Sequence, residues 1–115
     1  MNSDLVDSVR AAVARIPAGN VSTYGEVGKV AGCGPRYVGR VLREHGADLP
    51  WWRVVNARGE THDASRSITL WEAEGISFAR TDSKGARVCM SEHAIDAREL
   101  AALEHDVSRG DKFAG

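Results

Sequence analysis

The sequence predicts a single α+β domain that is mainly helical, and three observations carry this prediction. The chain has 115 residues, which fits one domain of ordinary size. Apolar residues recur every three or four positions in several segments, as they do along one face of a helix. Glycine and proline separate these segments, and only short runs have the character of strands. We therefore expect residues 1–115 to form one domain of short helices with a small amount of sheet.

The composition is that of an ordinary globular protein, and the sequence argues against a membrane-spanning protein and a secreted one. Hydrophobic residues make up 43% of the chain and charged residues 27%, both close to the averages for folded domains. No apolar run approaches the roughly 18 residues of a membrane-spanning helix, and the first ten residues lack the pattern of a secretory signal. Cys33 and Cys89 lie far apart. We therefore expect free thiols, a cytoplasmic location and no membrane partner.

Charge is distributed unevenly along the chain, although the net charge is only −1. Residues 21–66 contain seven basic and five acidic side chains, a net charge of +2, whereas residues 91–106 carry a net charge of −4. The near-neutral total argues mildly against a nucleic-acid partner. A basic middle followed by an acidic tail is nevertheless compatible with binding a polyanion through one face.

The first predicted helix follows an apolar stripe at helical spacing, made up of Leu5, Val6, Val9, Val13 and Ile16. A cap at Asn2 or Ser3 suits its start, and Asp4 favours the positive end of the helix dipole. The turn residues Pro17–Asn20 end it.

The second and third predicted helices form a tight pair. A capping box begins the second: the Thr23 hydroxyl can accept from the amide of Glu26, whose carboxylate can reach back. Residues 32–34 break this two-turn helix, and a proline suits the first turn of a third helix over Pro35–His45, which Gly46 ends. Two short helices joined by a glycine turn, with arginines on the second, are typical of a helix-turn-helix.

The next part of the chain mixes short apolar runs with helical patterns. Residues 51–59 begin apolar and end in a turn, which favours an extended segment leading to a wing or hairpin. A helix is predicted over Ile68–Glu74, and Gly75 ends it. Irregular chain follows, with short strands around Phe78 and Val88.

The C-terminal region is predicted as one acidic helix. Ser91 can cap a helix over residues 91–107 that places Leu100, Leu103 and Val107 on one stripe. We expect residues 108–115 to fray.

Nothing in the sequence indicates a metal site or a cofactor. The four histidines do not fall at metal-ligand spacings, and neither cysteine completes a set. The glycines at 32 and 34 begin like a dinucleotide-binding loop, but Tyr37 stands where the third glycine belongs, and no strand precedes them. We expect surface histidines and no cofactor.

The unusual local feature is the run Pro50-Trp51-Trp52-Arg53. A tryptophan pair is costly to bury because each indole N–H needs a hydrogen-bond partner. Either both rings anchor the core beneath the later helices, or they wall a pocket. Flat apolar walls suit a nucleobase, which gains roughly 1–3 kcal/mol by stacking on an aromatic ring.

Three motifs, in order, carry a resemblance to a known family. They are Val21–Val27, Arg36–Gly39 and Pro50–Gly59. Together they resemble the C-terminal DNA-binding domain of the O6-alkylguanine-DNA alkyltransferases, and more closely the alkyltransferase-like proteins. The resemblance covers about residues 5–78 and implies a winged helix-turn-helix-like DNA-binding domain of the alkyltransferase type. The chain from Ala79 onward matches no motif.

The resemblance implies binding without catalysis. In the alkyltransferases the motif Pro-Cys-His-Arg supplies the cysteine that accepts the alkyl group and a histidine that helps to activate it. Trp51 stands at the cysteine position here, and an indole cannot act as that nucleophile. Trp52 replaces the histidine, which alkyltransferase-like proteins typically keep. We therefore expect no enzymatic activity from this motif.

The resemblance also implies contacts with the minor groove of DNA. Tyr24 corresponds to the tyrosine that rotates the target nucleotide out of the duplex, and Arg36 to the finger that fills the vacated stack. Gly39 corresponds to the glycine that lets the helix approach the groove. The residues expected on sugar and phosphate are Tyr37, Arg40 and Arg43, with ordinary surface charge an equal alternative for the two arginines.

The lesion pocket that the resemblance implies surrounds the tryptophan pair. Its expected lining and wall residues are Trp51, Trp52, Val54 and Val55. Arg53 either braces the loop or touches DNA, and Arg66 is the nearest candidate for an arginine that closes over the flipped base.

These expectations define three functional hypotheses. The first is a non-enzymatic, monomeric sensor that binds O6-alkylguanine in double-stranded DNA, associates with the nucleoid when bound and flags the lesion for nucleotide-excision-repair proteins. The second is a winged-helix DNA-binding protein, regulatory or architectural, without lesion recognition, because the two tryptophans close the pocket. The third is a transferase that uses Cys33 or Cys89, neither of which has a neighbouring sequence feature that lowers the pKa of its thiol.

Overall fold

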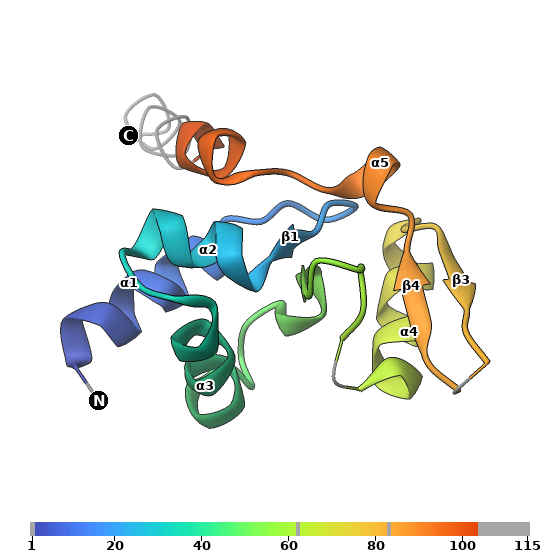
Figure 1. Cartoon of the computed structure of the whole chain (residues 1–115), viewed down its shortest axis with the longest axis horizontal. Helices are drawn as coiled ribbons and strands as arrows, with labels where there is room; N and C mark the ends of the chain where they lie inside the picture. Colours follow the sequence, from blue (N-terminus) through green and yellow to red (C-terminus); the bar gives the residue numbers. More distant parts are fainter. Residues whose placement is uncertain (1, 62, 83, 104–115) are drawn as a thin grey trace.

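Three helices make up the N-terminal part of the fold, and each contacts the other two (Figure 1). They are α1 (Ser3–Ala14), α2 (Tyr24–Ala31) and α3 (Pro35–His45). The structure, a computed structural model, describes residues 2–61, 63–82 and 84–103. Asn2 caps α1, because its side-chain oxygen accepts from the amides of Asp4 and Leu5. The predicted helix-turn-helix pair α2–α3 is confirmed.

The start of α2 confirms one half of the predicted capping box and contradicts the other. The Thr23 hydroxyl accepts from the amide of Glu26 at 3.0 Å, as predicted. The Glu26 carboxylate does not reach back; it lies 2.8 Å from the Lys29 ammonium and accepts from the amide of Ala97 at 2.8 Å. A segment more than 70 residues away in the sequence thereby competes for the carboxylate that a local box would have used.

The turn between α2 and α3 depends on one close approach of backbone to backbone. The carbonyl oxygen of Gly28 accepts from the amides of Gly32 and Cys33 at 2.7 and 2.9 Å. A Cβ at position 28 would lie only 2.4 Å from the carbonyl oxygen of Cys33. Gly28 therefore allows α3 to fold back tightly against α2, which fixes how α3 is presented to solvent.

A two-residue parallel pair connects the N-terminal helices to the rest of the fold. A short 3₁₀ helix, η1 (Trp51–Arg53), leads into β2 (Val54–Val55), which pairs with β1 (Ser22–Thr23). The prediction that residues 51–59 extend toward a wing or hairpin is therefore confirmed only in part. Residues 54–55 are extended and a turn follows them, but residues 51–53 coil once, and β2 pairs with β1 instead of forming a hairpin. Because alternate side chains of a strand face opposite ways, Val54 packs among α1–α3, and Val55 packs in a second cluster beneath α4 (Ala64–Glu74).

The helix predicted over Ile68–Glu74 begins earlier than expected. Asp63 caps α4, since its carboxylate accepts from the amide of Arg66 at 3.2 Å. Trp71 on this helix is fully buried, and its indole N–H donates to the carbonyl oxygen of Trp52 at 2.8 Å. This bond ties α4 to η1.

The wing of the fold lies after α4 rather than before it. The strands β3 (Phe78–Arg80) and β4 (Ala86–Val88) form an antiparallel hairpin, drawn beside α4 on the right of Figure 1. The predicted strands around Phe78 and Val88 are confirmed, and these two residues pair directly across the hairpin.

The C-terminal region is not the single helix predicted over residues 91–107. One helical turn, α5 (Met90–His93), ends at an extended Ala94, and residues 97–103 are helical again. The His93 ring explains the break, because its Nε2 accepts from the amide of Ser77 and its Nδ1 lies 2.9 Å from the carbonyl oxygen of Gly19. The part of the predicted helix beyond residue 103 and the expected frayed end at 108–115 lie outside the described residues.

The segment after α5 lies over α1 and α2 and completes their core (Figure 1). Val21 donates its amide to His93 and accepts from the amide of Ile95. Leu100 is fully buried in the cluster formed by α1, α2 and α3. The three N-terminal helices therefore do not have a complete core without residues from the end of the described chain.

A buried ion pair joins η1 to α4. Nη2 of Arg53 lies 2.6 Å from Oε2 of Glu74, and the two side chains are only 16% and 11% exposed. Glu74 also accepts from the Trp52 indole at 2.8 Å and from the amide of Gly19 at 3.1 Å, while Arg53 donates to the carbonyl oxygen of Ile16 at 2.7 Å. Burial alone would raise the pKa of Glu74, but these hydrogen bonds outweigh it and the pKa is lowered.

We predict that Glu74→Gln lowers the free energy of unfolding by about 2–3 kcal/mol, because the Arg53 charge is left buried without its counter-ion. Urea unfolding at pH 7 measures the loss. Glu72→Gln is the matched control, since Glu72 is exposed on the same helix. Equal stabilities of the two variants would contradict this role for the ion pair.

The contribution of Glu74 also has a predicted pH dependence. Because its pKa in the folded protein lies below the ordinary 4.5, the unfolded chain binds the proton more tightly, and stability is lost as the pH falls. The difference in unfolding free energy between wild type and Glu74→Gln should be constant above about pH 5.5 and shrink below pH 4.5. Unfolding curves at several pH values measure this; a difference that grows on acidification would contradict it.

Candidate functional site

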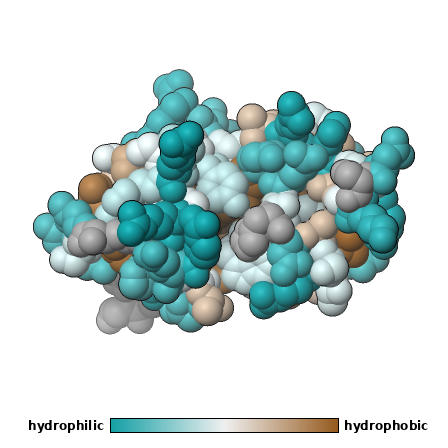
Figure 2. All heavy atoms as spheres, turned by 60° about the horizontal axis from the view of Figure 1, so that its bottom comes forward, coloured by the Kyte–Doolittle hydropathy of each residue, from teal (hydrophilic) through white to brown (hydrophobic). Residues whose placement is uncertain are grey.

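The exposed face of α3 is basic. Arg36, Arg40 and Arg43 are all exposed on this helix. Arg40 lies 3.6 Å from Glu44, whereas Arg36 and Arg43 have no carboxylate partner within the part of the chain that the structure describes. Figure 2 turns this side of the molecule forward and shows hydrophilic side chains over much of it. Such a face suits a polyanion, since its cations are not already neutralised.

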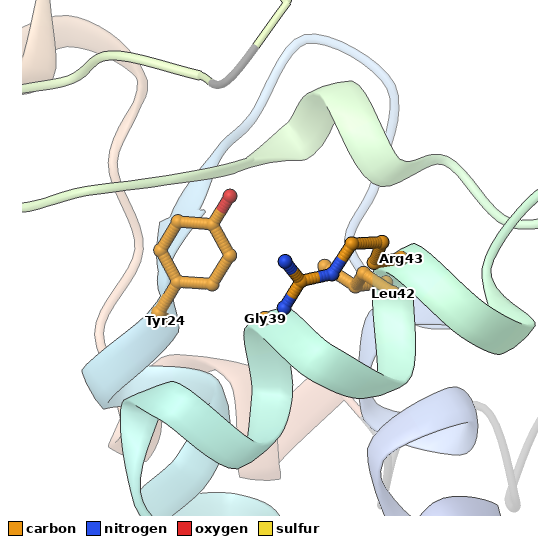
Figure 3. Close-up of a pocket in the computed structure, with 4 residues that line it drawn as sticks. All are labelled: Tyr24, Gly39, Leu42 and Arg43. Atoms are coloured by element: carbon orange, nitrogen blue, oxygen red, sulfur yellow. The ribbon is translucent and has the colours of Figure 1, made fainter.

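A hollow of about 230 Å³ lies between the start of α2 and the middle of α3. It is lined by Tyr24, Gly39, Leu42 and Arg43. Figure 3 shows the Arg43 guanidinium reaching across Gly39 toward the Tyr24 ring. The Tyr24 hydroxyl, whose ordinary pKa of 10.0 is raised further by burial, is protonated at neutral pH and can donate a hydrogen bond into this space.

Gly39 is not required by the fold itself. A Cβ at this position would meet the Tyr24 ring at 3.8 Å, which is an ordinary contact. The predicted reason for glycine here, close approach of a ligand to the helix, is therefore compatible with the space the residue leaves open.

A second hollow, of about 190 Å³, shares Leu42 and Arg43 with the first. Its other lining residues are Gly46, Ala47, Trp51 and Arg66. The Arg66 guanidinium carbon lies 5.0 Å from the centre of the Trp51 ring, within the range of a cation–π interaction. The structure thus brings together two residues that the sequence analysis placed in one pocket.

The sequence left two roles open for the tryptophan pair, anchoring the core and walling a pocket, and the structure combines them. Trp51 is only 9% exposed and belongs to the core of α1–α3, yet it also lines the second hollow. Trp52 packs edge-on against it, with ring centres 5.8 Å apart and planes at 87°. Trp52 lines neither hollow, and its indole N–H donates to Glu74. It therefore supports Trp51 from behind.

Three other expected site residues are held inside the fold, and a fourth, Tyr37, is half-buried at its surface. Val54 and Val55 are fully buried and line neither hollow, so they lie behind the site rather than in its wall. Arg53 is paired with Glu74 and braces the loop, which favours the first of its two predicted roles. The Tyr37 hydroxyl donates to the carbonyl oxygen of Asn2 at 3.2 Å and links α3 to the start of α1.

Sequence reasoning missed four residues of the site and its support. Leu42, Gly46 and Ala47 line the hollows, and Glu74 holds Trp52. Leu42 is one of the buried apolar residues of α3, and Gly46 is the glycine that ends this helix, so neither position by itself indicates a site. Glu74 had no local signal at all, because its partners are 21, 22 and 55 residues away in the sequence.

The described residues give little support to a cysteine nucleophile, a metal site or a membrane-spanning helix. Burial raises the pKa of the Cys33 thiol, which opposes formation of a thiolate. In the ranges that the structure covers, no three histidine, cysteine, aspartate or glutamate side chains gather as a metal would need. The described helices are also too short or too polar to cross a bilayer.

Comparison with known proteins links these features to DNA. The family model for the DNA-binding domain of 6-O-methylguanine DNA methyltransferase matches residues 4–76. The DNA base-flipping protein of Vibrio parahaemolyticus is 43% identical over 74 residues, which cover 57% of this chain and 74% of that protein. The DNA base-flipping protein of Escherichia coli is 53% identical over 72 residues, but these cover only 56% of each chain.

A fungal relative has been solved with DNA. Alkyltransferase-like protein 1 of Schizosaccharomyces pombe is 42% identical over 81 residues, covering 61% of this chain and 74% of that protein. The crystal structure of S. pombe Atl1 in complex with damaged DNA containing O6-carboxymethylguanine matches with a TM-score of 0.75 and 28% identity. That match covers 84% of this chain and 98% of the other. The chain therefore belongs to the family of the O6-methylguanine-DNA methyltransferase DNA-binding domain and has the fold of its alkyltransferase-like members.

Proposed function

We propose that this chain is a non-enzymatic sensor that flips O6-alkylguanine out of double-stranded DNA and holds it in the two hollows beside α3. The observation that carries the proposal is the Trp51–Arg66 pair, an aromatic ring and a cation 5.0 Å apart in a hollow that opens next to the basic face of α3. A flipped purine can stack on such a ring and accept hydrogen bonds from such a cation.

The proposed roles of the α3 face follow from its geometry. Arg36 is exposed and has no described carboxylate partner, so its planar guanidinium is available to enter the base stack. Tyr24 stands at the edge of the first hollow, where it can push on the phosphate of the target nucleotide. The residues proposed to contact sugar and phosphate are Gly39, Arg40 and Arg43. Tyr37, whose hydroxyl is bonded to Asn2, is proposed to contact DNA through its ring edge.

The preference for a lesion has an energetic basis. Extruding a base from a duplex costs a few kcal/mol, and it costs least where damage already weakens pairing. An alkyl group on guanine O6 disrupts pairing and adds apolar surface, and each buried CH₂ contributes roughly 0.8 kcal/mol. Leu42, Ala47 and the Trp51 ring supply apolar surface in the second hollow. Both effects favour alkylated over normal guanine.

Binding without alkyl transfer is part of the proposal. Trp51 and Trp52 stand where the alkyltransferase motif has its cysteine and histidine, and neither indole is a nucleophile or a general base for this chemistry. Cys33, whose thiol pKa is raised by burial, lines neither hollow. The relatives named base-flipping and alkyltransferase-like proteins support this assignment.

A persistent complex of this kind marks the damaged site. We propose that the protein acts as a cytoplasmic, nucleoid-associated monomer and that the complex flags the lesion for nucleotide-excision-repair proteins. The sequence resemblance supports the coupling to repair.

A second candidate function is DNA binding without lesion recognition. The observation that favours it also concerns the Trp51–Arg66 pair. Trp51 is only 9% exposed, and Arg66 lies over its ring. If Arg66 stays there, no base can stack on that face of the ring.

The two candidates predict different affinities for matched duplexes that contain guanine or O6-methylguanine. The sensor should bind the O6-methylguanine duplex at least about tenfold more tightly, and tryptophan fluorescence should change as the base reaches Trp51. A fluorescence titration with both duplexes measures this. Equal affinities would discard the sensor and leave the second candidate.

Arg36→Ala should weaken binding of the O6-methylguanine duplex more than binding of the guanine duplex, because the finger acts only when a base is flipped. The same titration measures both losses. Arg98→Ala is the control, since Arg98 is exposed on the helical segment 97–103 at the opposite side of the fold. A uniform loss across both duplexes would make Arg36 a simple phosphate contact.

A further inference from the structure

A second basic surface lies on the wing, well away from α3 in the sequence. Its exposed cations are Arg58, Arg80, Lys84 and Arg87, which we call the wing surface. Arg58 belongs to the turn at 56–60, and this turn lies directly against β4, because the amide of Val88 donates to the carbonyl oxygen of Gly59 at 2.9 Å. Two segments therefore contribute to one patch.

The wing surface is only partly neutralised. Glu60 lies 3.6 Å from Arg87, and the Asn56 side chain, together with the nearby Arg87 and Arg58 charges, lowers the pKa of Glu60. Asp82 is the one carboxylate in residues 78–88. Four cations thus face two carboxylates, which leaves a net charge of +2. An open hollow of about 490 Å³ lies here, with Arg80, Arg87 and Asp82 as the charged residues of its lining.

The position of this patch relates it to α3. In Figure 1 the end of β3 and the beginning of β4 point to the same lower side of the molecule as α3, whereas the acidic C-terminal segment lies along the upper side. Arg66, near the start of α4, shares a hollow with Arg43 of α3, and in Figure 1 the start of α4 is drawn between α3 and the hairpin. The basic groups are arranged across one side of the protein, as contact with an extended polyanion requires.

We propose that the wing surface is a second contact site for the DNA backbone, which binds phosphates of the same duplex beyond those reached by α3. This rests on the proposed binding of duplex DNA, but not on lesion recognition. The contact is with phosphates alone, so it strengthens binding to damaged and undamaged DNA by the same factor.

The backbone conformation at Lys84 allows a substitution that removes its charge without disturbing the hairpin turn. Lys84 has a φ of 64°, a left-handed conformation that glycine adopts without strain. Lys84→Gly therefore removes a charge and preserves the turn. We combine it with Arg80→Gln, which removes a second wing charge from an exposed side chain.

The matched control removes the same charge from the opposite side. Lys29→Gln with Arg98→Gln changes two exposed cations on α2 and on the helical segment 97–103, of which Lys29 is the ion-pair partner of Glu26. Both double variants have the same net charge, so any difference between them reports position rather than total charge. Circular-dichroism melts verify that each variant folds.

The measurement is the dissociation constant for the guanine and O6-methylguanine duplexes between 50 and 300 mM salt, about the range over which phosphate contacts are resolved. Each lost phosphate contact reduces the slope of log affinity against log salt by about 0.9. We expect the wing variant to lose a slope of about 2 and about tenfold in affinity at 150 mM salt, equally for both duplexes. The control should match wild type.

Three results would overturn the proposal. These are an unchanged slope in the wing variant, an equal loss in the control variant, or a loss confined to the O6-methylguanine duplex. If wild type binds both duplexes equally while the wing variant still loses slope, lesion sensing fails and the wing contact stands. If the wing variant keeps its slope while wild type prefers the lesion, only the wing contact fails.

Discussion

The site depends on the buried Arg53–Glu74 ion pair. This pair and its hydrogen bonds to Trp52, Gly19 and Ile16 join the chain that follows α1, the 3₁₀ helix η1 and the last residue of α4. A charge pair that is nearly excluded from water is stable only when every polar atom has a partner, and here the partners come from three separate elements. The position of η1, and with it the Trp51 ring, therefore follows from this one arrangement.

The wall of the second hollow is built from residues of two different parts of the molecule, the three-helix cluster and the cluster beneath α4. Leu42 and Arg43 come from the three-helix cluster, and Arg66 comes from the helix that covers the other cluster. Trp51 lies where they meet, supported from behind by Trp52. A ligand in this hollow would contact both parts at once. Its binding would therefore be sensitive to how firmly they are joined.

Local patterns in the sequence were enough to predict the helix-turn-helix and the basic face of α3. Capping by Thr23, the proline at the start of α3 and the apolar spacing are all short-range signals, and the structure confirms these helices. The prediction for residues 51–59 was only partly right and the single C-terminal helix was wrong, because contacts far apart in the sequence decided those segments. His93 binds Gly19 and Ser77, and β2 pairs with β1. For the same reason, Glu74 and Ala47 could not be identified as parts of the site or its support.

The burial of Leu100 has a consequence for how the protein is made. Leu100 completes the core of α1, α2 and α3, and the strand-like contacts of Val21 with His93 and Ile95 hold that segment in place. On the ribosome the helix-turn-helix emerges long before this residue. The nascent chain therefore cannot bury its core fully until residues near 100 have left the exit tunnel, and in that interval its apolar helix faces are open to chaperones.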